Sequence, residues 1–267
     1  EAEPIGVGCV VKVLTAIVTM GLESRGVLNL RDPIADIIEA VSQDEHEVLS
    51  QVNIGHLLKH THGIDAKDIE SAHEGMVADV PFRERRPFVS LFEAGDYVAY
   101  SSLGYRVLGT VLERATQRSF RELVQENVVD PVSAIIGRGL SGKSYMNRAL
   151  GEPESRVASC PAVGTGLRMS CAELLLLGSE FVSKTPRLNS RQFYRRMLDL
   201  HTPAPAQGGF YDGMSLGLWR HGDGIFGHEG SSDRKSSVIV RLVPNEEIAI
   251  VLVARFKAAL FLDELLP

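Results

Sequence analysis

The chain has 267 residues, of which 44% are hydrophobic and 23% are charged. This composition excludes a disordered protein and fits one large domain or two lobes that share a cleft. The formal net charge is -6 and no run of lysines or arginines occurs, which argues against a nucleic-acid-binding protein. The longest apolar segment, Val7 to Leu22, contains Lys12 and falls short of the roughly 20 residues that cross a bilayer, so no membrane span is expected.

The start of the chain and its cysteines bear on where the protein works. Residues 1–4 contain neither an initiating methionine nor a signal-peptide pattern, so we expect a processed, trimmed or truncated end. The three cysteines, Cys9, Cys160 and Cys171, are odd in number and irregularly spaced, which is not the pattern of a disulfide framework. We therefore expect a reducing compartment, the cytoplasm.

The first predicted helix runs from about Val10 to Arg25. Its first four turns are apolar on almost every side, as in a buried central helix, and Gly26 follows as a C-terminal cap. Further helices are predicted at residues 34–41, 54–60, 172–183 and 188–200, with two more inside 103–128. Connections are predicted at residues 138–168 and 201–209, which are rich in glycine, serine or proline.

The C-terminal part of the sequence has the pattern of strands. Residues 236–243 and 247–255 flank a turn at Pro244-Asn245 and predict an antiparallel hairpin, and residues 257–265 predict a closing helix. A helical middle followed by strands indicates an α+β fold, because a doubly wound fold would alternate strands and helices.

Cys9 and Lys12 are the first candidates for chemistry. Cys9 stands at the first position of the buried helix, where backbone N–H groups and the helix dipole favour a thiolate. Lys12 follows one turn later on the same face, where burial is expected to lower its pKa. The pair suits a nucleophile and its proton partner. Alone, a cysteine in an apolar helix is usually a core residue, but an unpaired buried ammonium is costly, so Lys12 favours the functional interpretation.

Two segments resemble the serine β-lactamases and penicillin-binding proteins. Residues 8–34, GCVVKVLTAIVTMGLESRGVLNLRDPI, are similar to the region where a serine-x-x-lysine motif opens a hydrophobic helix. Residues 54–63, IGHLLKHTHG, are similar to the family's I-x-x-L-L-x-H-T-S-G segment, with His62 where serine is usual. Cys9 stands in the place of the family's nucleophilic serine. The resemblance therefore implies that Cys9 is the nucleophile and Lys12 its proton partner.

Two more segments extend the resemblance. Residues 100–102, Tyr-Ser-Ser, fall on the family's tyrosine-x-asparagine motif, which implies that Tyr100 acts as general base and then as acid. Ser102 replaces the asparagine and lacks the amide's fixed donor and acceptor, which weakens the case for a β-lactam-type substrate. Residues 162–178 resemble the family's G-G-L-x-S-T-x-x-D-L segment, where Cys171 is expected to be structural.

The third motif, GHEGS at residues 227–231, is similar to the histidine-x-glycine motif of the esterase-like and acyltransferase-like branches. The resemblance implies that His228 lines the cleft from an edge strand and supports proton transfer. It also implies that Gly230 permits close approach of substrate and that the N–H groups of Cys9 and Ser231 form an oxyanion hole. The residues expected to bind substrate or the oxyanion are Ser102, Trp219, Gly230 and Ser231.

The resemblance implies an α+β, β-lactamase/transpeptidase-like fold, with an antiparallel sheet flanked by helices and a mostly helical lobe. The helical lobe is expected at about 27–160, and the α/β lobe at about 161–267, packed with the helix at 9–26. Only eight residues precede Cys9, whereas the family has several dozen that supply strands. These strands are expected to be short or absent, supplied by another chain or segment, or missing from the sequence; an open sheet edge would favour a homodimer.

The resemblance implies acyl transfer through a covalent acyl-Cys9 intermediate. A thioester on Cys9 has nearly the same energy as a coenzyme A or carrier-protein thioester. Transfer from a small-molecule thioester or ester donor to an amine or alcohol is therefore favoured over transfer to water. No cofactor is expected. If Cys9 is an engineered replacement for serine, the acyl-transfer site is unchanged but the thioester argument fails.

Three alternatives stay open. The first is a carboxylesterase or amidase-type hydrolase. The second is a catalytically silent β-lactamase-like binding protein, against which Lys12, Tyr100 and His228 speak. The third is a metal site on the H-x3-H-x-H histidines of residues 56–62, although no nearby carboxylate or thiol completes a ligand set and the resemblance assigns His60 a packing role.

Overall fold

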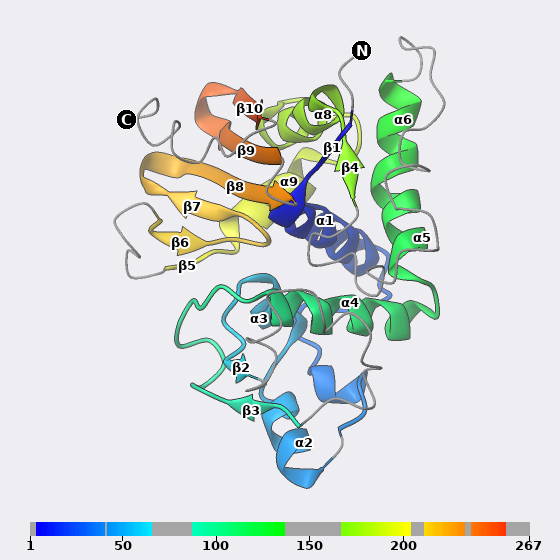
Figure 1. Cartoon of the computed structure of the whole chain (residues 1–267), viewed down its shortest axis with the longest axis vertical. Helices are drawn as coiled ribbons and strands as arrows, with labels where there is room; N and C mark the ends of the chain where they lie inside the picture. The colour runs from blue at the N-terminus through cyan, green and yellow to red at the C-terminus, as the bar shows by residue number, and fades with distance from the viewer. Residues whose placement is uncertain are drawn as a thin grey trace.

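The structure is a computed structural model, and it describes residues 4–40, 42–65, 87–136, 167–203, 211–232 and 236–254. It has the expected α+β architecture, in which an antiparallel sheet and its covering helices form one side and a mostly helical region forms the other (Figure 1). The long helix α1 runs between the two sides. The predicted fold class is therefore confirmed.

Within the described residues, the main sheet has six antiparallel strands in the order β10-β9-β8-β7-β6-β5. The strands are β5 (Thr202–Pro203), β6 (Gly213–Met214), β7 (Trp219–His221), β8 (Ile225–Ser232), β9 (Ser236–Val243) and β10 (Ile248–Ala254), with 3-10 turns η7 (Gly222–Gly224) and η8 (Pro244–Glu246) between them. The predicted hairpin is β9 and β10, where Val243 lies opposite Ile248. Strands β5 to β7 were not predicted, because two or three residues are too few to show an alternating pattern; β5 lies inside the predicted connection at 201–209.

The helix α1 (Val11–Ser24) follows one 3-10 turn, η1 (Gly8–Val10), and every residue from Val11 to Leu22 is buried. The two threonine hydroxyls inside it donate to carbonyl oxygens one turn earlier, so they are buried with a partner. The chain leaves the helix at Gly26, whose φ of 71° favours glycine. The predicted central helix is confirmed.

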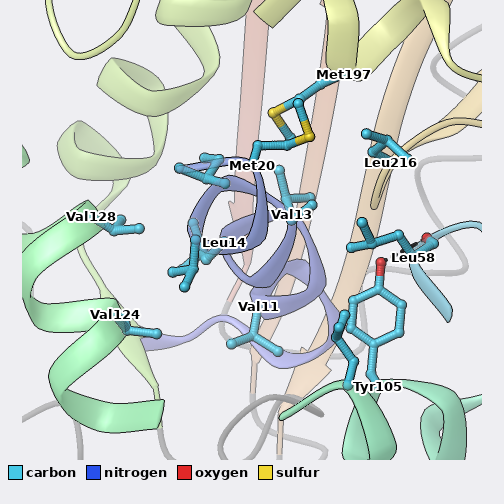
Figure 2. Close-up of a cluster of buried hydrophobic side chains, with 14 of the residues drawn as sticks. Val11, Val13, Leu14, Met20, Leu58, Tyr105, Val124, Val128, Met197 and Leu216 are labelled. Atoms are coloured by element: carbon cyan, nitrogen blue, oxygen red, sulfur yellow. Dashed lines mark hydrogen bonds between the residues drawn. The ribbon is translucent and has the colours of Figure 1, made fainter. Parts of the chain in front are cut away.

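Apolar side chains of α1 form the centre of the core. Figure 2 shows Val11, Val13, Leu14 and Met20 of this helix among side chains from the surrounding elements. The labelled partners are Leu58, Tyr105, Val124, Val128, Met197 and Leu216. Burying one aliphatic side chain of this size stabilises a fold by about 1.5–3 kcal/mol. Because the side chains of α1 pack against elements of both sides, this helix joins the two sides of the molecule. The same packing fixes the position of its N-terminal end.

Two helices cover the sheet and flank α1. α8 (Cys171–Val182) packs against β9 and β10, and α9 (Arg191–Asp199) packs against α8 and α1, so both predicted helices are confirmed. The strand β1 (Ile5–Gly6) pairs with β4 (Arg168–Met169) in a separate two-stranded sheet. The described residues before Cys9 thus form a short strand outside the main sheet.

The helical side includes most of the remaining elements. These are η2 (Ile34–Asp36), α2 (Gln43–Ser50), α3 (Ile54–Leu58) and α4 (Ser102–Thr116), with β2 (Ile64–Asp65) paired to β3 (Val89–Ser90). The helices α5 (Phe120–Val124), the π-helical η5 (Gln125–Val129) and α6 (Asp130–Ile136) run along the flank of the molecule, where α5 and η5 contact α1 and α6 contacts α8 (Figure 1). The predictions at 54–60 and 103–128 are confirmed. The predicted helix at 34–41 is wrong for residues 34–40, which the structure describes: only the 3-10 turn η2 forms there. The next helix begins after Ser42, whose hydroxyl accepts the N–H of Glu45 as an N-cap.

Some predictions fall outside the described residues. The connection at 138–168 does so except for its last two residues, and the closing helix at 257–265 does so entirely. The division into two lobes stays a prediction. In the part of the chain that the structure describes, no helix combines the length and the apolarity needed to cross a membrane.

Candidate active site

Cys9 lies in the turn η1, where this turn meets strand β8. The two backbones approach so closely that only glycine fits on either side. A Cβ on Gly8 would lie 2.5 Å from the amide nitrogen of Ser231, and a Cβ on Gly230 would lie 2.1 Å from the carbonyl oxygen of Val7 and 2.9 Å from the amide nitrogen of Cys9. Gly8 also has a φ of 52°, which favours glycine. The approach brings the N–H groups of Cys9 and Ser231 into the same small region, beside a partly buried free thiol.

Lys12 is completely buried one turn further along α1. Burial lowers the pKa of its ammonium, and the charge and hydrogen bonding of Cys9 oppose this shift only in part. Its Nζ atom makes no hydrogen bond of regular geometry with a described residue, and it lies 5.0 Å from the ring centre of Tyr100 and 5.6 Å from that of Tyr105. Burial therefore shifts Lys12 toward the neutral amine, the form that can accept a proton.

Tyr100 forms the boundary between this buried amine and the solvent. It lies in the extended segment before α4 and is 37% exposed. Its ring centre lies 4.4 Å from that of His60, 5.7 Å from that of Trp219 and 6.0 Å from that of His228. Loss of solvent contact raises the pKa of Tyr100 first, and the neighbouring Cys9 raises it further. These shifts favour the protonated phenol, and the role of Tyr100 as general base and then acid stays a prediction.

His228 lies on β8 and is buried. Its Nδ1 atom lies 2.7 Å from the carbonyl oxygen of Glu229; because a carbonyl only accepts, Nδ1 carries the proton and Nε2 is left as an acceptor. Burial, and next the charge of Lys12, lower the pKa of His228 to about 3. The expected edge strand is wrong, because β8 lies between β7 and β9. The structure thus brings Cys9, Lys12, Tyr100 and His228 into one cluster.

The two other predicted binding residues differ in their placement. Trp219 is buried on β7 and stacks between Tyr211, at 4.5 Å between ring centres, and Tyr100. Ser102 is the exposed first residue of α4. The N-cap of this helix is the preceding residue, Ser101, whose hydroxyl accepts the N–H of Gly104. Trp219 therefore lies against the cluster, whereas the side chain of Ser102 faces solvent.

Sequence reasoning missed how closely His60 is joined to this cluster. Its ring is fully buried between Tyr100 and Tyr105, and its Nδ1 atom accepts the N–H of Ser101 at 3.1 Å. Burial, and then the charges of Lys12 and two histidines, hold the pKa of His60 well below its usual value near 6.5. The packing role implied by the family motif covers only part of these contacts, because the bond to Ser101 joins segments about forty residues apart in sequence.

The other histidines of this segment make local bonds of their own. The Nδ1 atom of His62 accepts the N–H of Ile64 at 2.9 Å, and that of His56 accepts the N–H of Asn53 at 3.3 Å. The ring of His62 lies against Gly104, where a Cβ would come within 2.3 Å of its Nε2 atom. Among the described residues, no three histidine, cysteine, aspartate or glutamate side chains are grouped as metal ligands.

Comparison with known proteins places these observations in a family. Penicillin-binding protein 4 of Amycolatopsis lactamdurans is 31% identical over 126 residues, which are 47% of this chain and 33% of that protein. The crystal structure of SurE with D-Leu matches with a TM-score of 0.69 at 25% identity, over 98% of this chain and 62% of SurE. This chain therefore spans a third of the first relative and less than two thirds of the second.

A third match shows the fold alone. The D-amino acid amidase from Ochrobactrum anthropi SV3, complexed with D-phenylalanine, superposes with a TM-score of 0.70 at 16% identity, over 96% of this chain and 86% of the amidase. Together these matches confirm the resemblance and the fold that the motifs predicted. The family model described as Beta-lactamase matches residues 1–260, and the chain therefore belongs to the beta-lactamase family.

Proposed function

We propose that this protein transfers acyl groups through a thioester intermediate on Cys9. The observation that carries the proposal is the buried Lys12 beside Cys9, with a lowered pKa and no hydrogen bond of regular geometry to a described residue. A buried lysine whose pKa is lowered gives up its proton more readily, and its neutral amine can take a proton from an adjacent thiol without help from a third group. The structural alternative, a lysine held only for stability, would place an acidic partner beside the ammonium.

In the first half-reaction the amine of Lys12 takes the proton of the Cys9 thiol, and the sulfur attacks the carbonyl carbon of the donor. The N–H groups of Cys9 and Ser231 donate to the oxyanion that forms. The bond from the carbonyl carbon to the leaving group then breaks. The leaving group takes a proton from the phenol of Tyr100, and the ammonium of Lys12 replaces that proton. Cys9 is left as a thioester.

In the second half-reaction an amine, an alcohol or water attacks the thioester carbon. The Nε2 atom of His228 accepts a hydrogen bond from this nucleophile and orients it, because the proton of the imidazole is fixed on Nδ1. The neutral Lys12 takes the proton of the nucleophile, the bond from carbon to sulfur breaks, and the sulfur of Cys9 recovers a proton from Lys12. Tyr100 serves as acid, because its raised pKa keeps the phenol protonated.

Two of the similar structures support a proposal about the substrate class. SurE was crystallised with D-Leu, and the amidase was complexed with D-phenylalanine. We therefore assign the acyl donor to esters, amides and thioesters of D-configured amino acids, including small carrier-bound or coenzyme A thioesters. A hydrolase is the second candidate, since one of these relatives is an amidase and the orienting acceptor on His228 suits water as well as an amine.

Intact mass spectrometry tests the proposal. The protein is incubated with the N-acetylcysteamine thioester of N-acetyl-D-leucine and, separately, with its L enantiomer. The expected adduct forms with the D compound on the wild-type protein and on Cys171→Ala, a matched variant of the other described free cysteine. It is absent from Cys9→Ala. An adduct that persists on Cys9→Ala would remove this residue from the mechanism, and no adduct with any donor would support the silent binding protein.

Products separate transfer from hydrolysis. The same reaction is run with and without butylamine, and the products are identified by mass. Transfer predicts the butylamide when the amine is present, with free acid formed mainly in its absence. Free acid alone under both conditions would leave hydrolysis as the function.

A further inference from the structure

We propose that His60 is a positioning residue, which holds the Tyr100 phenol against Lys12 through hydrogen bonds on both sides of Tyr100. The effect on catalysis rests on the proposed function of Cys9 and Tyr100, whereas the effect on the position of the phenol does not. His60 follows α3, far from Tyr100 in sequence, and it is the only residue described as bonding to both neighbours of that tyrosine in the chain.

Two hydrogen bonds fix the segment that carries the phenol. The carbonyl oxygen of His60 accepts the N–H of Ala99 at 2.8 Å, and its Nδ1 atom accepts the N–H of Ser101 at 3.1 Å. These donors belong to the residues directly before and after Tyr100. One residue therefore holds the extended backbone on both sides of the phenol, in a segment that has no sheet partner among the described residues.

Ring contacts then fix the side chain. The imidazole of His60 packs on Tyr100 with ring centres 4.4 Å apart, and Tyr105 lies behind it at 5.0 Å. Tyr105 is itself fully buried, and its hydroxyl donates to the carbonyl oxygen of Leu58 at 2.9 Å. The phenol of Tyr100 thus lies between a fixed imidazole on one side and Trp219 on the other.

This arrangement requires a neutral imidazole. Because Nδ1 accepts a hydrogen bond, the single proton of the ring is on Nε2. A second proton would break the bond to Ser101 and place a cation near the amino group of Lys12. Burial, Lys12, His62 and His228 act in the same direction on the pKa of His60. The other rings packed against His60, those of Tyr100 and Tyr105, belong to neutral phenols whose pKa values are raised by burial.

The backbone of His60 narrows the choice of variants. Its φ is 55°, in the left-handed region that asparagine tolerates better than most residues. The side-chain oxygen of asparagine occupies nearly the place of Nδ1, whereas that of glutamine reaches toward the place of Nε2. His60→Asn therefore keeps an acceptor for Ser101, and His60→Gln loses it while remaining a neutral amide.

The experiment compares His60→Asn and His60→Gln in the full chain. Steady-state kinetics with the D-leucyl thioester should give a kcat about 100-fold below wild type for His60→Gln, as expected for a misplaced acid, with an unchanged KM. His60→Asn should lose about tenfold at most. A residue needed only for packing would give equal losses in both variants, and that result would overturn the proposal.

Fluorescence gives a readout that does not depend on activity. Trp219 is the only tryptophan in the chain and stacks on Tyr100, so its emission reports where the phenol lies. His60→Gln should shift the emission toward that of Tyr100→Ala, and His60→Asn should keep the wild-type spectrum. Wild-type emission in a folded His60→Gln would show that His60 does not position Tyr100 and would overturn the proposal. This result would count even if Cys9→Ala had already shown that the proposed function is wrong. If His60→Gln does not fold, a folded His60→Asn with altered emission overturns the proposal by itself.

Discussion

The helix α1 buries a group that can carry charge near each of its ends, and it surrounds the two differently. At the C-terminal end, the carboxylate of Glu23 accepts from Arg196 at 2.9 Å and from the N–H of Leu30 at 3.3 Å, and a second guanidinium nitrogen lies 2.7 Å from its other oxygen. At the N-terminal end, Lys12 has no comparable partner among the described residues. A buried charge that stabilises the fold is paired, whereas a group left without a regular partner beside a thiol is available for proton transfer.

Replacement of Lys12 tests the catalytic end of this comparison and should have the largest effect. Lys12→Met keeps the length and packing of the side chain but removes the base, so kcat/KM for acyl transfer should fall about 10³-fold. Because methionine is buried without loss of hydration, the free energy of unfolding should stay constant or rise by about 1 kcal/mol. Enzyme kinetics and thermal unfolding measure the two quantities.

A matched control is available on α3. Lys59 is a half-buried lysine whose pKa is also lowered by burial, but no described contact joins it to Cys9. Lys59→Met should keep wild-type kinetics. A large loss of stability in Lys12→Met would mean that this lysine is paired like Glu23, and the comparison of the two helix ends would fail.

The pH dependence of wild-type activity should show the same base. Lys12 must be neutral to accept the thiol proton, and its pKa lies below the ordinary value near 10.5. Activity should therefore rise about tenfold per pH unit on the acid side and reach a plateau above the pKa of the Cys9–Lys12 pair. A profile of kcat/KM from pH 5 to 10 measures this limb. An identical limb in Lys12→Met would assign the titration to another group.

His62 extends the comparison to stability in acid. Its pKa is lowered to about 4 by burial and then by His56. Between pH 6.5 and pH 4 the unfolded chain therefore binds a proton on His62 that the folded protein does not bind. The stability that depends on neutral His62 is complete above pH 6.5 and is lost as the pH falls toward 4. In His62→Ser, the loss of unfolding free energy between pH 7 and pH 4 should be smaller by about 3 kcal/mol. Urea unfolding at both pH values measures it, and an equal loss in both proteins would contradict the assignment.

The sequence predicted best those parts that are long and regular. The apolar run of α1 and the hairpin of β9 and β10 each show a clear period, and both were located to within a few residues. Strands β5 to β7 are too short to show one and were not predicted. The family resemblance implied an edge strand for His228, but β8 lies inside the sheet, between β7 and β9. A strand's neighbours depend on pairing across the sheet, which local periodicity does not contain.

For the site, too, the sequence predicted some features and not others: it named the residues of the motifs, but not the contacts that form only when distant segments pack together. The motifs named Cys9, Lys12, Tyr100 and His228, because family spacing carries the long-range information that a single sequence lacks. The role of His60 was not visible, since it depends on the N–H of Ser101, which lies beside His60 because α4 packs on α3. The fit of His62 against Gly104 was hidden for the same reason.

Removal of the charge of Glu23 tests the structural end of α1. Glu23→Gln keeps the shape of the side chain but breaks the ion pair with Arg196, whose side chain is 49% exposed. Because solvent can rehydrate the arginine, the free energy of unfolding should fall by about 2 kcal/mol rather than by the larger cost of a fully buried pair. The acyl-transfer rate should not change. A loss of activity as large as that of Lys12→Met would show that the two ends of α1 are not independent.

Arg196→Lys gives the smallest expected effect and separates geometry from charge. The guanidinium contacts both oxygens of Glu23, and an ammonium reaches only one of them at good geometry. Since the charge is kept and half of the arginine is exposed, the free energy of unfolding should fall by about 0.5 kcal/mol. Arg195→Lys, an exposed substitution on the same helix, should leave urea unfolding unchanged. Equal stability of the two variants would mean that Glu23 needs only a nearby positive charge, and the difference between the two ends of α1 would then reduce to the presence or absence of a cation.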